Sequence, residues 1–198
     1  MHTQLLHTQG DAGVSDSERS FLFLVGSSRA DGNTETLARR AAEQLPPTTD
    51  RRWLRLGDLA LPLFEDRRHE GEGPRPASSG LAERLLEATL AATDIVVVSP
   101  LDWYSVSTAT KLYLDLWSGW MRVPGLDFLE RMRGKTLWSV TVHGGQDPAT
   151  AAPLVGTLRH TADYAGMRWG GALLGYGSGP GDVLRDTAAL GRAKAFFS

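Results

Sequence analysis

Short apolar runs alternate with segments of helical periodicity along most of this chain. Each run predicts a buried strand, because a strand that is covered on both faces is apolar almost throughout. The expected strands cover residues 21–25, 52–56, 95–99, 136–142 and 168–175. The spacing of the intervening apolar residues predicts helices over 33–45, 81–92, 107–120, 147–166 and 182–197. This alternation indicates a parallel sheet with helices on both faces, because parallel strands need crossover connections of one hand.

The number of expected strands selects one topology. Five strands favour the doubly wound, flavodoxin-like order 2-1-3-4-5, in a three-layer α/β/α fold, over the six-stranded dinucleotide-binding fold. With 198 residues the chain suits one domain, expected over 21–198, after a polar and flexible N-terminal extension over 1–20. Residues 61–80 are rich in proline, glycine and charge, and we expect a long surface loop there. Pro153 lies inside the expected fourth helix, which can therefore begin later.

Composition excludes several kinds of site and partner. The chain contains no cysteine, which rules out disulfides, thiolate metal sites, Fe–S clusters and a cysteine nucleophile. None of the five histidines has metal-ligand spacing to another His, Asp or Glu. No stretch approaches the ~18 apolar residues of a membrane span, and the N-terminus lacks the pattern of a signal peptide, so we expect a cytoplasmic protein without a membrane partner. Residues 21–198 carry 20 acidic and 20 basic residues, a balance that gives no indication of a nucleic-acid partner.

The connection between the first expected strand and the first expected helix has an unusual composition. Residues 26–34 read GSSRADGNT. The backbone N–H groups of a helix N-terminus attract an anion, and hydroxyl, amide and guanidinium donors in the same loop add to that attraction. The candidate anion contacts are Ser27, Arg29, Gly32, Asn33 and Thr34. The loop has neither the Gly-Lys-Ser/Thr of a Walker A sequence nor G-x-G-x-x-G, so it favours a single phosphate, with an ordinary strand–helix turn as the alternative.

Two further loops belong to the same end of the expected sheet. In an open parallel sheet, ligands bind at the carboxyl ends of the strands, beside the point where the strand order reverses. This rule selects the loops after the first, third and fourth strands. The second of these loops reads SPLDWYSVSTATK over 99–111, and the third reads HGG over 143–145. We therefore expect the three loops to form one site.

The three loops together resemble the NAD(P)H-dependent FMN reductase family, which has a flavodoxin-like fold. The pattern G-S-S-R-x-x-G-N-T looks like the phosphate loop of that family. Residues 99–111, with Asp115 after them, are similar to the family's P-x-Y-x-x-S-x-x-x-x-K-x-x-x-D segment, which wraps the isoalloxazine ring of the flavin. The Gly-Gly turn matches the small-residue turn on the other side of the ring. The resemblance spans about 21–197, and it departs from the family at Leu101 and Asp102, where related sequences often have an aromatic residue.

The resemblance implies FMN as cofactor and NAD(P)H as a transient co-substrate. The ring contacts that it implies are Pro100, Leu101, Asp102, Trp103, Tyr104, Ser105, His143, Gly144 and Gly145. The side chains of Trp103 and Tyr104 can cover a flat ring, and packing in a core or an interface is the alternative. No catalytic side chain is expected, because the cofactor carries the redox step, although His143 as a general base stays open. Lys111 and Asp115 have the spacing of a structural helix pair.

The function that follows is an oxidoreductase that passes a hydride from NAD(P)H through FMN to a small acceptor, such as a quinone, a flavin or an azo compound. The alternative is a flavodoxin-type electron carrier that does not turn over nicotinamide. Such carriers are usually strongly acidic, so the balanced charge of 21–198 favours the enzyme. The resemblance also implies a homodimer or homotetramer. Trp117 and Trp120 suit either the core or a dimer interface.

Overall fold

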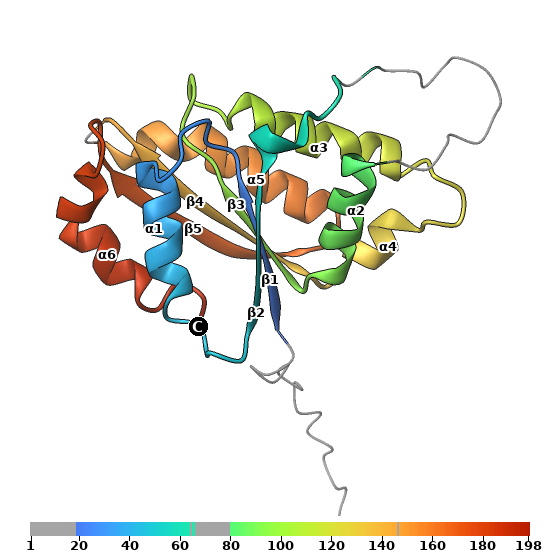
Figure 1. Ribbon diagram of the computed structural model, residues 1–198, viewed down its shortest axis with the longest axis horizontal. Helices are drawn as coiled ribbons and strands as arrows, with labels where there is room; N and C mark the ends of the chain where they lie inside the picture. The colour runs from blue at the N-terminus through green and yellow to red at the C-terminus, as the bar shows by residue number, and fades with distance from the viewer. Residues whose placement is uncertain (1–18, 64, 66–79, 146) are drawn as a thin grey trace, which may run out of the picture.

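The computed structural model describes residues 19–63, 65, 80–145 and 147–198, and its centre is a five-stranded parallel sheet (Figure 1). The strand order is β2-β1-β3-β4-β5, which confirms the predicted flavodoxin-like topology. The strands are β1 (Ser20–Val25), β2 (Asp50–Arg55), β3 (Asp94–Val98), β4 (Thr136–His143) and β5 (Arg168–Tyr176). The helices are α1 (Asn33–Ala42), α2 (Leu81–Ala91), α3 (Thr108–Trp120), α4 (Phe128–Met132), α5 (Ala152–Tyr164) and α6 (Thr187–Ala193). Short 3-10 turns are η2 (Leu56–Leu59), η3 (Pro148–Ala151) and η4 (Asp182–Arg185).

Strand β1 occupies the position where the order of the sheet reverses. Leu24 lies opposite Leu54 of β2 on one side and opposite Val97 of β3 on the other. The chain leaves β1 toward β2 and later returns to β3, so the connections diverge on the two sides of this strand. Their divergence opens a crevice at the carboxyl end of β1, which is the usual ligand position in a doubly wound sheet.

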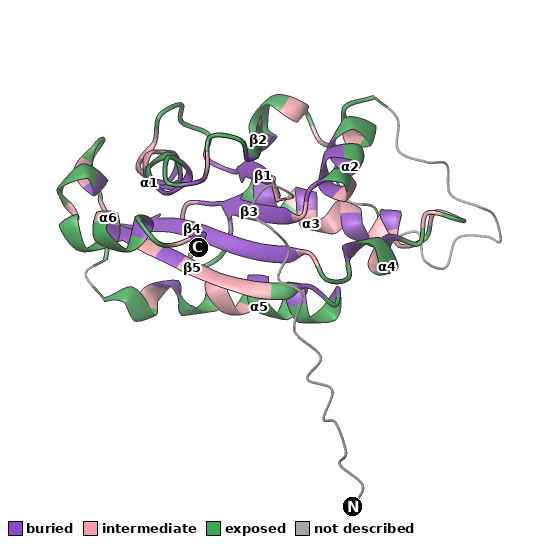
Figure 2. Ribbon diagram, turned by 90° about the horizontal axis from the view of Figure 1, so that it is seen from below, coloured by how far each residue is buried: buried purple, intermediate pink, exposed green. Residues whose placement is uncertain are grey.

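Two hydrophobic cores hold the three layers together. One core packs α1 and α6 against the sheet, and the other packs α2, α3, α4 and α5 against the opposite face. The strands between them are buried on both sides, as the purple colour of β3 and β4 in Figure 2 shows. Complete burial of both faces explains why the central strands read as continuous apolar runs in the sequence.

Trp117 and Trp120 belong to the second core. They are 5% and 2% exposed, and both contact the ring of Phe128 at centroid distances of 5.4 and 5.6 Å. Of the two readings that the sequence left open, core packing is therefore correct. A dimer contact through these two side chains is wrong, because the chain's own α3 and α4 already cover them.

The edge strand β5 pairs with β4 along most of its length, with one irregularity at its two glycines. A Cβ atom at Gly170 would lie 2.3 Å from the ring of Trp138, so only glycine lets that indole cross the strand. A bulge between Leu137 and Trp138 accompanies the crossing. Gly170 thus accommodates a large side chain of the neighbouring strand, whereas Gly171 has a φ of 124°, a conformation that favours glycine.

Several helix and strand boundaries differ from those expected from the sequence. The second strand begins at Asp50 and ends before Leu56, which starts η2. The expected closing helix over 182–197 is wrong, because Asp186 ends η4 and caps α6 by accepting from the backbone N–H of Ala189 at 2.9 Å. The fourth helix begins at Ala152, after η3, which places Pro153 in its first turn. The short α4 was not expected, since five residues are too few to show a helical period.

The two irregular segments of the sequence fall largely outside the described residues. Of the expected extension over 1–20, only Arg19 and Ser20 are described, and both lie within the fold: Ser20 begins β1, and Arg19 forms an ion pair with Asp94. Of the expected loop over 61–80, residues 61–63, 65 and 80 are described. Among the described residues, no helix is long and apolar enough to cross a membrane.

Candidate FMN site

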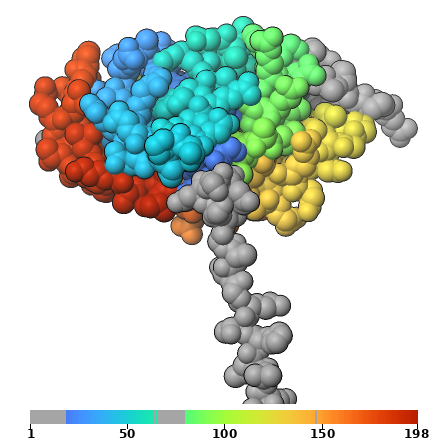
Figure 3. All heavy atoms as spheres, turned by 60° about the horizontal axis from the view of Figure 1, so that its bottom comes forward, coloured from blue at the N-terminus to red at the C-terminus, as the bar shows by residue number. Residues whose placement is uncertain are grey.

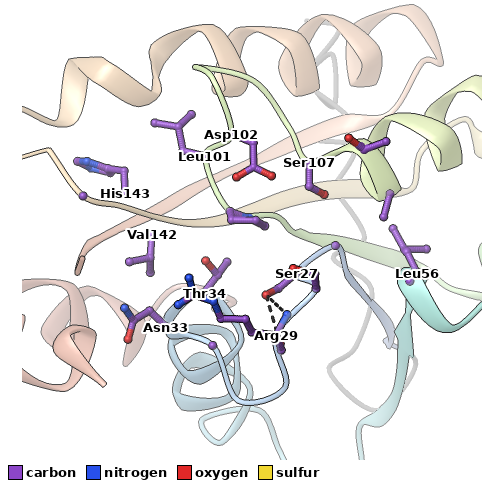
Figure 4. Close-up of a pocket in the computed structure, with 18 of the residues that line it drawn as sticks. Ser27, Arg29, Asn33, Thr34, Leu56, Leu101, Asp102, Ser107, Val142 and His143 are labelled. Carbon is purple, nitrogen blue, oxygen red and sulfur yellow. Dashed lines mark hydrogen bonds between the residues drawn. The ribbon is translucent and has the colours of Figure 1, made fainter. Parts of the chain in front are cut away.

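A cavity of about 850 Å³ opens at the carboxyl ends of the strands, beside the reversal of strand order (Figure 4). The three loops selected from the sequence all contribute to its walls. In Figure 4, Ser27, Arg29, Asn33 and Thr34 lie on one side of the cavity, and Leu101, Asp102 and Ser107 lie across from them. The expectation that the loops after β1, β3 and β4 come together is confirmed.

Gly26 lets the first loop rest directly on the start of α3. A Cβ atom at this position would lie 2.1 Å from Oγ1 of Thr110 and 2.6 Å from Oγ of Ser107. Its backbone N–H donates to the carbonyl of Val98 at 2.9 Å, which extends the pairing of β1 and β3 by one residue. The loop after β1 and the N-terminus of α3 are therefore in contact only because residue 26 has no side chain.

The start of α1 faces the cavity without a side-chain cap. Gly32 is the N-cap residue, and no side chain of the described residues accepts a hydrogen bond from the first turn. The first backbone N–H groups of a helix have no partner within the helix, so here they are available to a ligand. The helix dipole makes that ligand an anion. The guanidinium of Arg29 is exposed beside this position, without a hydrogen bond to any described residue.

An ion-pair network around the buried carboxylate of Glu35 holds the loop in place. Nη1 of Arg55 donates to the carbonyls of Ser27 and Arg29 at 3.1 and 2.9 Å, and Nη2 of Arg55 donates to Glu35 at 2.5 Å. Arg39 donates to the other oxygen of Glu35 at 2.6 Å. Burial alone would raise the pKa of Glu35, but the hydrogen bonds from Arg39 and Arg55 outweigh burial and hold that pKa below its usual value.

Arg55 and Glu35 are not among the site residues expected from the sequence. Arg55 lies more than twenty residues from the loop that it supports, and nothing in the order of residues joins them. The signal that can find Arg55 is its position as the last residue of β2, at the same carboxyl edge of the sheet.

Residues 102–105 form a tight hairpin at the edge of the cavity. Asp102 and Ser105 exchange two backbone hydrogen bonds of 3.0 Å. Trp103 and Tyr104 occupy the two central positions with φ of 48° and 65°, a left-handed conformation that costs bulky residues about 1–3 kcal/mol each. Their side chains are 94% and 58% exposed, so the core-packing alternative for both residues is wrong. Strained backbone of this kind gathers at ligand-binding segments.

Two buried polar atoms of the cavity-lining residues have no hydrogen-bond partner among the described residues. His143, at the end of β4, is 6% exposed, and its Nδ1 atom accepts or donates no hydrogen bond there. Asn33 donates to the carbonyl of Gly179 at 2.8 Å, but its Oδ1 atom is unpaired. Buried polar atoms are normally hydrogen-bonded, so these two are candidates to meet a ligand or water.

The structure places most of the predicted site residues in the cavity lining and some outside it. The lining contains Ser27, Arg29, Gly32, Asn33, Thr34, Pro100, Leu101, Asp102, His143 and Gly144. The predicted residues outside the lining are Trp103, Tyr104, Ser105 and Gly145. The lining also includes two regions that the sequence analysis did not select, after β2 (Leu56, Gly57, Ala60 and Leu61) and after β5 (Gly177 and Ser178). The same carboxyl-edge rule, applied to all five strands, would have found both.

The charge of the lining is nearly neutral. Among the described residues of the lining, Arg29 is the one arginine or lysine and Asp102 is the one carboxylate. Among the described residues, no three His, Cys, Asp or Glu side chains are grouped as a metal site. Lys111 and Asp115 form the expected ion pair on α3, where both remain partly exposed. A nearly neutral lining with an uncapped helix start suits a polar ligand that carries a single phosphate.

Comparison with known proteins agrees with this geometry. Residues 20–169 match the family described as NADPH-dependent FMN reductase. YwqN of Bacillus subtilis (strain 168), named as an NAD(P)H-dependent FMN-containing oxidoreductase, is 31% identical over 172 residues, covering 85% of this chain and 91% of that protein. The structure of the Trp repressor binding protein from Bacillus subtilis has a TM-score of 0.71 and 26% identity, over 90% of this chain and 97% of that chain. An FMN-dependent NADH-azoreductase from Bacillus anthracis in complex with FMN shares the fold at 13% identity, with a TM-score of 0.62 over 91% of this chain and 100% of that chain.

The fold and the cavity define a flavodoxin-like protein with a cavity at the switch point of its sheet, which is the usual ligand position in this class. More particularly, the chain belongs to the NADPH-dependent FMN reductase family. This result confirms the expected NAD(P)H-dependent FMN oxidoreductase, with FMN as cofactor and NAD(P)H as co-substrate.

The residues of the cavity fit FMN. Its volume of about 850 Å³ lies within the range of small-molecule sites, about 300–1,000 Å³. The uncapped start of α1 provides a position for one phosphate; the unpaired Oδ1 of Asn33 can accept a hydrogen bond, and the unpaired Nδ1 of His143 can accept or donate one.

Proposed function

We propose that this chain binds one FMN in the cavity and uses NAD(P)H to reduce a small acceptor, such as a quinone, a free flavin or an azo compound. The observation that carries the proposal is the start of α1, where free backbone N–H groups and Arg29 meet the cavity at the switch point. Backbone N–H donors at a helix start can bind an anion without a cluster of positive side chains. The nearly neutral lining of the cavity is therefore compatible with a bound phosphate.

The phosphate is bound by the loop after β1. Ser27, Arg29, Gly32, Asn33 and Thr34 contribute the contacts, with backbone donors at the α1 start and a charge-assisted hydrogen bond from Arg29. Support comes from their common position in the cavity lining and from the anchoring of this loop by Arg55. The anchoring matters because a preorganised loop loses little entropy when it binds.

The isoalloxazine ring lies between the loops after β3 and β4. Pro100, Leu101 and Asp102 form one wall, and His143 and Gly144 form the other, as their positions in the lining support. The hairpin leaves the N–H groups of Trp103 and Tyr104 without a backbone acceptor in the described part of the chain, so they are free to donate to the polar edge of the ring.

Four residues of the predicted site lie outside the cavity lining and have a different kind of support. Trp103, Tyr104 and Ser105 lie just beyond the cavity lining, at the hairpin whose strain indicates a binding role. Gly145 follows Gly144 and continues the opposite wall. We assign these residues to the ring contacts through their backbone and, for the two aromatic residues, through cover of the ring.

The chain's own contribution to the reaction is binding, orientation and exclusion of water. Bound FMN would supply the redox chemistry, which is hydride transfer from NAD(P)H and electron transfer to the acceptor. The residues of the cavity hold it in place, and the walls keep solvent from the reacting face. No side chain is assigned a catalytic role.

The proposal extends to assembly and location. Trp103 and Tyr104 expose a large aromatic surface beside the cavity, and a second copy of the chain can cover it, which supports a homodimer or homotetramer. Light scattering coupled to size-exclusion chromatography tests this: a monomer at all concentrations would contradict it. The cytoplasm is the proposed location, and cell fractionation checks it.

Flavin content and anaerobic reduction test the main proposal. The purified protein should be yellow and release one FMN per chain. Mixing it with NADPH or NADH without oxygen should bleach the flavin absorption rapidly, and the faster nicotinamide is the physiological one. A panel of quinone, flavin and azo acceptors then ranks the substrates by kcat/KM.

Two results would contradict the proposal in different ways. Colourless protein that takes up no flavin on titration would remove the cofactor assignment. Flavin that binds but is not bleached by either nicotinamide would favour the flavodoxin-type carrier, which exchanges electrons only with a redox partner.

A further inference from the structure

A second hollow lies at the opposite end of the sheet, where the strands begin. It has a volume of about 300 Å³, and we call it the basic hollow. Its charged lining consists of Arg19, Asp94, Arg131, Arg133, Lys135 and Arg168. These residues come from the starts of β1, β3 and β5, the end of α4 and the turn before β4. Figure 3 turns this end of the molecule forward, with α4 and the adjoining loop in yellow.

Two of its five cations are accounted for by carboxylates. Arg19 donates to both oxygens of Asp94, at 3.2 and 2.8 Å, and also to the carbonyl of Phe197 at 2.7 Å. Arg133 donates to Glu130 at 3.1 Å, in a pair whose side chains are 66% and 72% exposed and therefore weakly coupled. Neither of these two ion pairs neutralises the charge of the other three cations.

The other three cations have no carboxylate partner in the part of the chain that the structure describes. Arg131 is exposed and forms no hydrogen bond with those residues, and Arg168 is exposed and makes one long contact of 3.4 Å with the hydroxyl of Thr136. Lys135 donates to the carbonyls of Leu90 and Ala92, at the end of α2. An ammonium group has three donors, so Lys135 keeps one for a ligand.

The accumulation of charge is unfavourable in the free protein. Burial lowers the pKa of Lys135, Arg131 lowers it further, and Asp94 opposes the shift. A chain whose residues 21–198 balance 20 acidic against 20 basic groups has no general excess of positive charge, so the excess here is local. An anion in the basic hollow would offset the repulsion between Arg131 and Lys135.

From this concavity and these unpaired cations we infer that the basic hollow is a second binding site, separate from the FMN cavity, for a small phosphate-bearing ligand. Two guanidinium groups and one ammonium group match the oxygens of a phosphate or diphosphate, because arginine binds such groups through paired N–H donors and lysine acts as a point charge. The volume of about 300 Å³ suits a ligand from diphosphate to mononucleotide size. The site does not depend on the proposed electron acceptor.

Titration calorimetry of the FMN-saturated protein tests this inference, with inorganic phosphate, pyrophosphate and ADP as probes. Saturation with FMN fills the first phosphate position. We expect one pyrophosphate per chain, bound more tightly than phosphate because it carries more charge. ADP that binds more tightly than pyrophosphate identifies a nucleotide as the ligand, and equal or weaker ADP binding identifies a free phosphate compound; both support the site.

A matched pair of double variants assigns the binding to the basic hollow. Arg131→Gln with Arg168→Gln should weaken pyrophosphate binding about tenfold or more, since two charge-assisted contacts are lost. Arg52→Gln with Arg159→Gln removes the same charge from two exposed arginines outside the hollow, and should change affinity less than twofold. Thermal unfolding and the flavin spectrum check that both variants are folded.

Three outcomes would overturn the inference. The first is the absence of saturable binding by all three probes at millimolar concentration. The second is unchanged affinity in the Arg131/Arg168 variant. The third is an equal loss in the Arg52/Arg159 variant, because binding would then follow the net charge of the protein. Each outcome is independent of whether NAD(P)H reduces the flavin.

Discussion

Two helices begin at the FMN cavity, and their first turns differ. At α3, Oγ of Ser107 accepts a hydrogen bond from the backbone N–H of Thr110 at 3.3 Å. At α1, Gly32 provides no side chain, and the N–H groups of the first turn have no such acceptor among the described residues. Helices α2 and α5 also lack a side-chain cap, so its absence alone has no functional meaning. At α1 the missing cap bears on function, because the first turn of this helix borders the cavity.

The capped start of α3 stabilises the fold, whereas the uncapped start of α1 is available to bind a ligand. A cap satisfies the free donors of a helix and contributes about 1 kcal/mol to stability. A helix that keeps its donors free gives up that stability and gains an anion site. The four predictions below test this division at α1 and α3, from the largest expected effect to the smallest.

Gly26→Ala should disrupt both helix starts at once. Its Cβ atom would lie 2.1 Å from Thr110 Oγ1, so either the loop or the cap of α3 must move. Overpacking of this kind costs about 1–3 kcal/mol, which urea denaturation measures, and FMN affinity should fall more than in any variant below. Gly156→Ala on α5, where no atom lies within 4 Å of the added methyl group, is the control and should not destabilise the protein.

Arg29→Ala should affect the phosphate alone. FMN affinity should fall about tenfold, the value of one charge-assisted hydrogen bond, whereas riboflavin, which lacks the phosphate, should bind unchanged. Fluorescence titration measures both ligands. Arg40→Ala, an exposed arginine on α1 paired with Glu43, controls for net charge. Equal losses for FMN and riboflavin would place the phosphate elsewhere.

Ser107→Ala should weaken the fold rather than the phosphate site. Loss of the cap should lower the free energy of unfolding by about 1 kcal/mol, measured in urea. FMN and riboflavin should weaken by the same factor, because α3 does not hold the phosphate. A loss specific to FMN would show that the two helix starts share the anion.

The smallest expected effect is on the free energy of unfolding at low pH. The pKa of Glu35 is lower in the folded chain than its usual value of 4.5, so the ionised carboxylate stabilises the fold above about pH 4.5. This contribution should disappear as the pH falls below 4.5 and through the lower pKa of the folded state. Unfolding free energies between pH 6 and pH 3 should therefore fall more steeply in the wild type than in Glu35→Gln, and parallel curves would contradict the assignment.

The sequence predicted the features that depend on neighbouring residues. Buried parallel strands are apolar on both faces, so the five strands and their order could be deduced, and the loop at 26–34 contains its own donors and glycines. The three loops could be joined because topology brings the carboxyl ends of strands together.

The remaining features depend on contacts between distant residues. The support of the phosphate loop by Arg55, the covering of Trp117 and Trp120 by α4, and the grouping of cations in the basic hollow all join segments far apart in the chain. A tryptophan on one face of a helix looks the same in sequence whether its own chain or another covers it. The left-handed hairpin at Trp103 and Tyr104 was also hidden, since neither residue favours that conformation.

The exposed hairpin gives the protein an internal optical probe. Of the six tryptophans, Trp103 alone is exposed, at 94%, and the others are buried or half-buried. Its fluorescence should therefore be emitted at longer wavelength than that of the others, and subtraction of a Trp103→Phe spectrum isolates it. Anything that covers the hairpin, whether nicotinamide, acceptor or a second chain, should shift this emission to shorter wavelength, which makes events at the cavity entrance visible without an added dye.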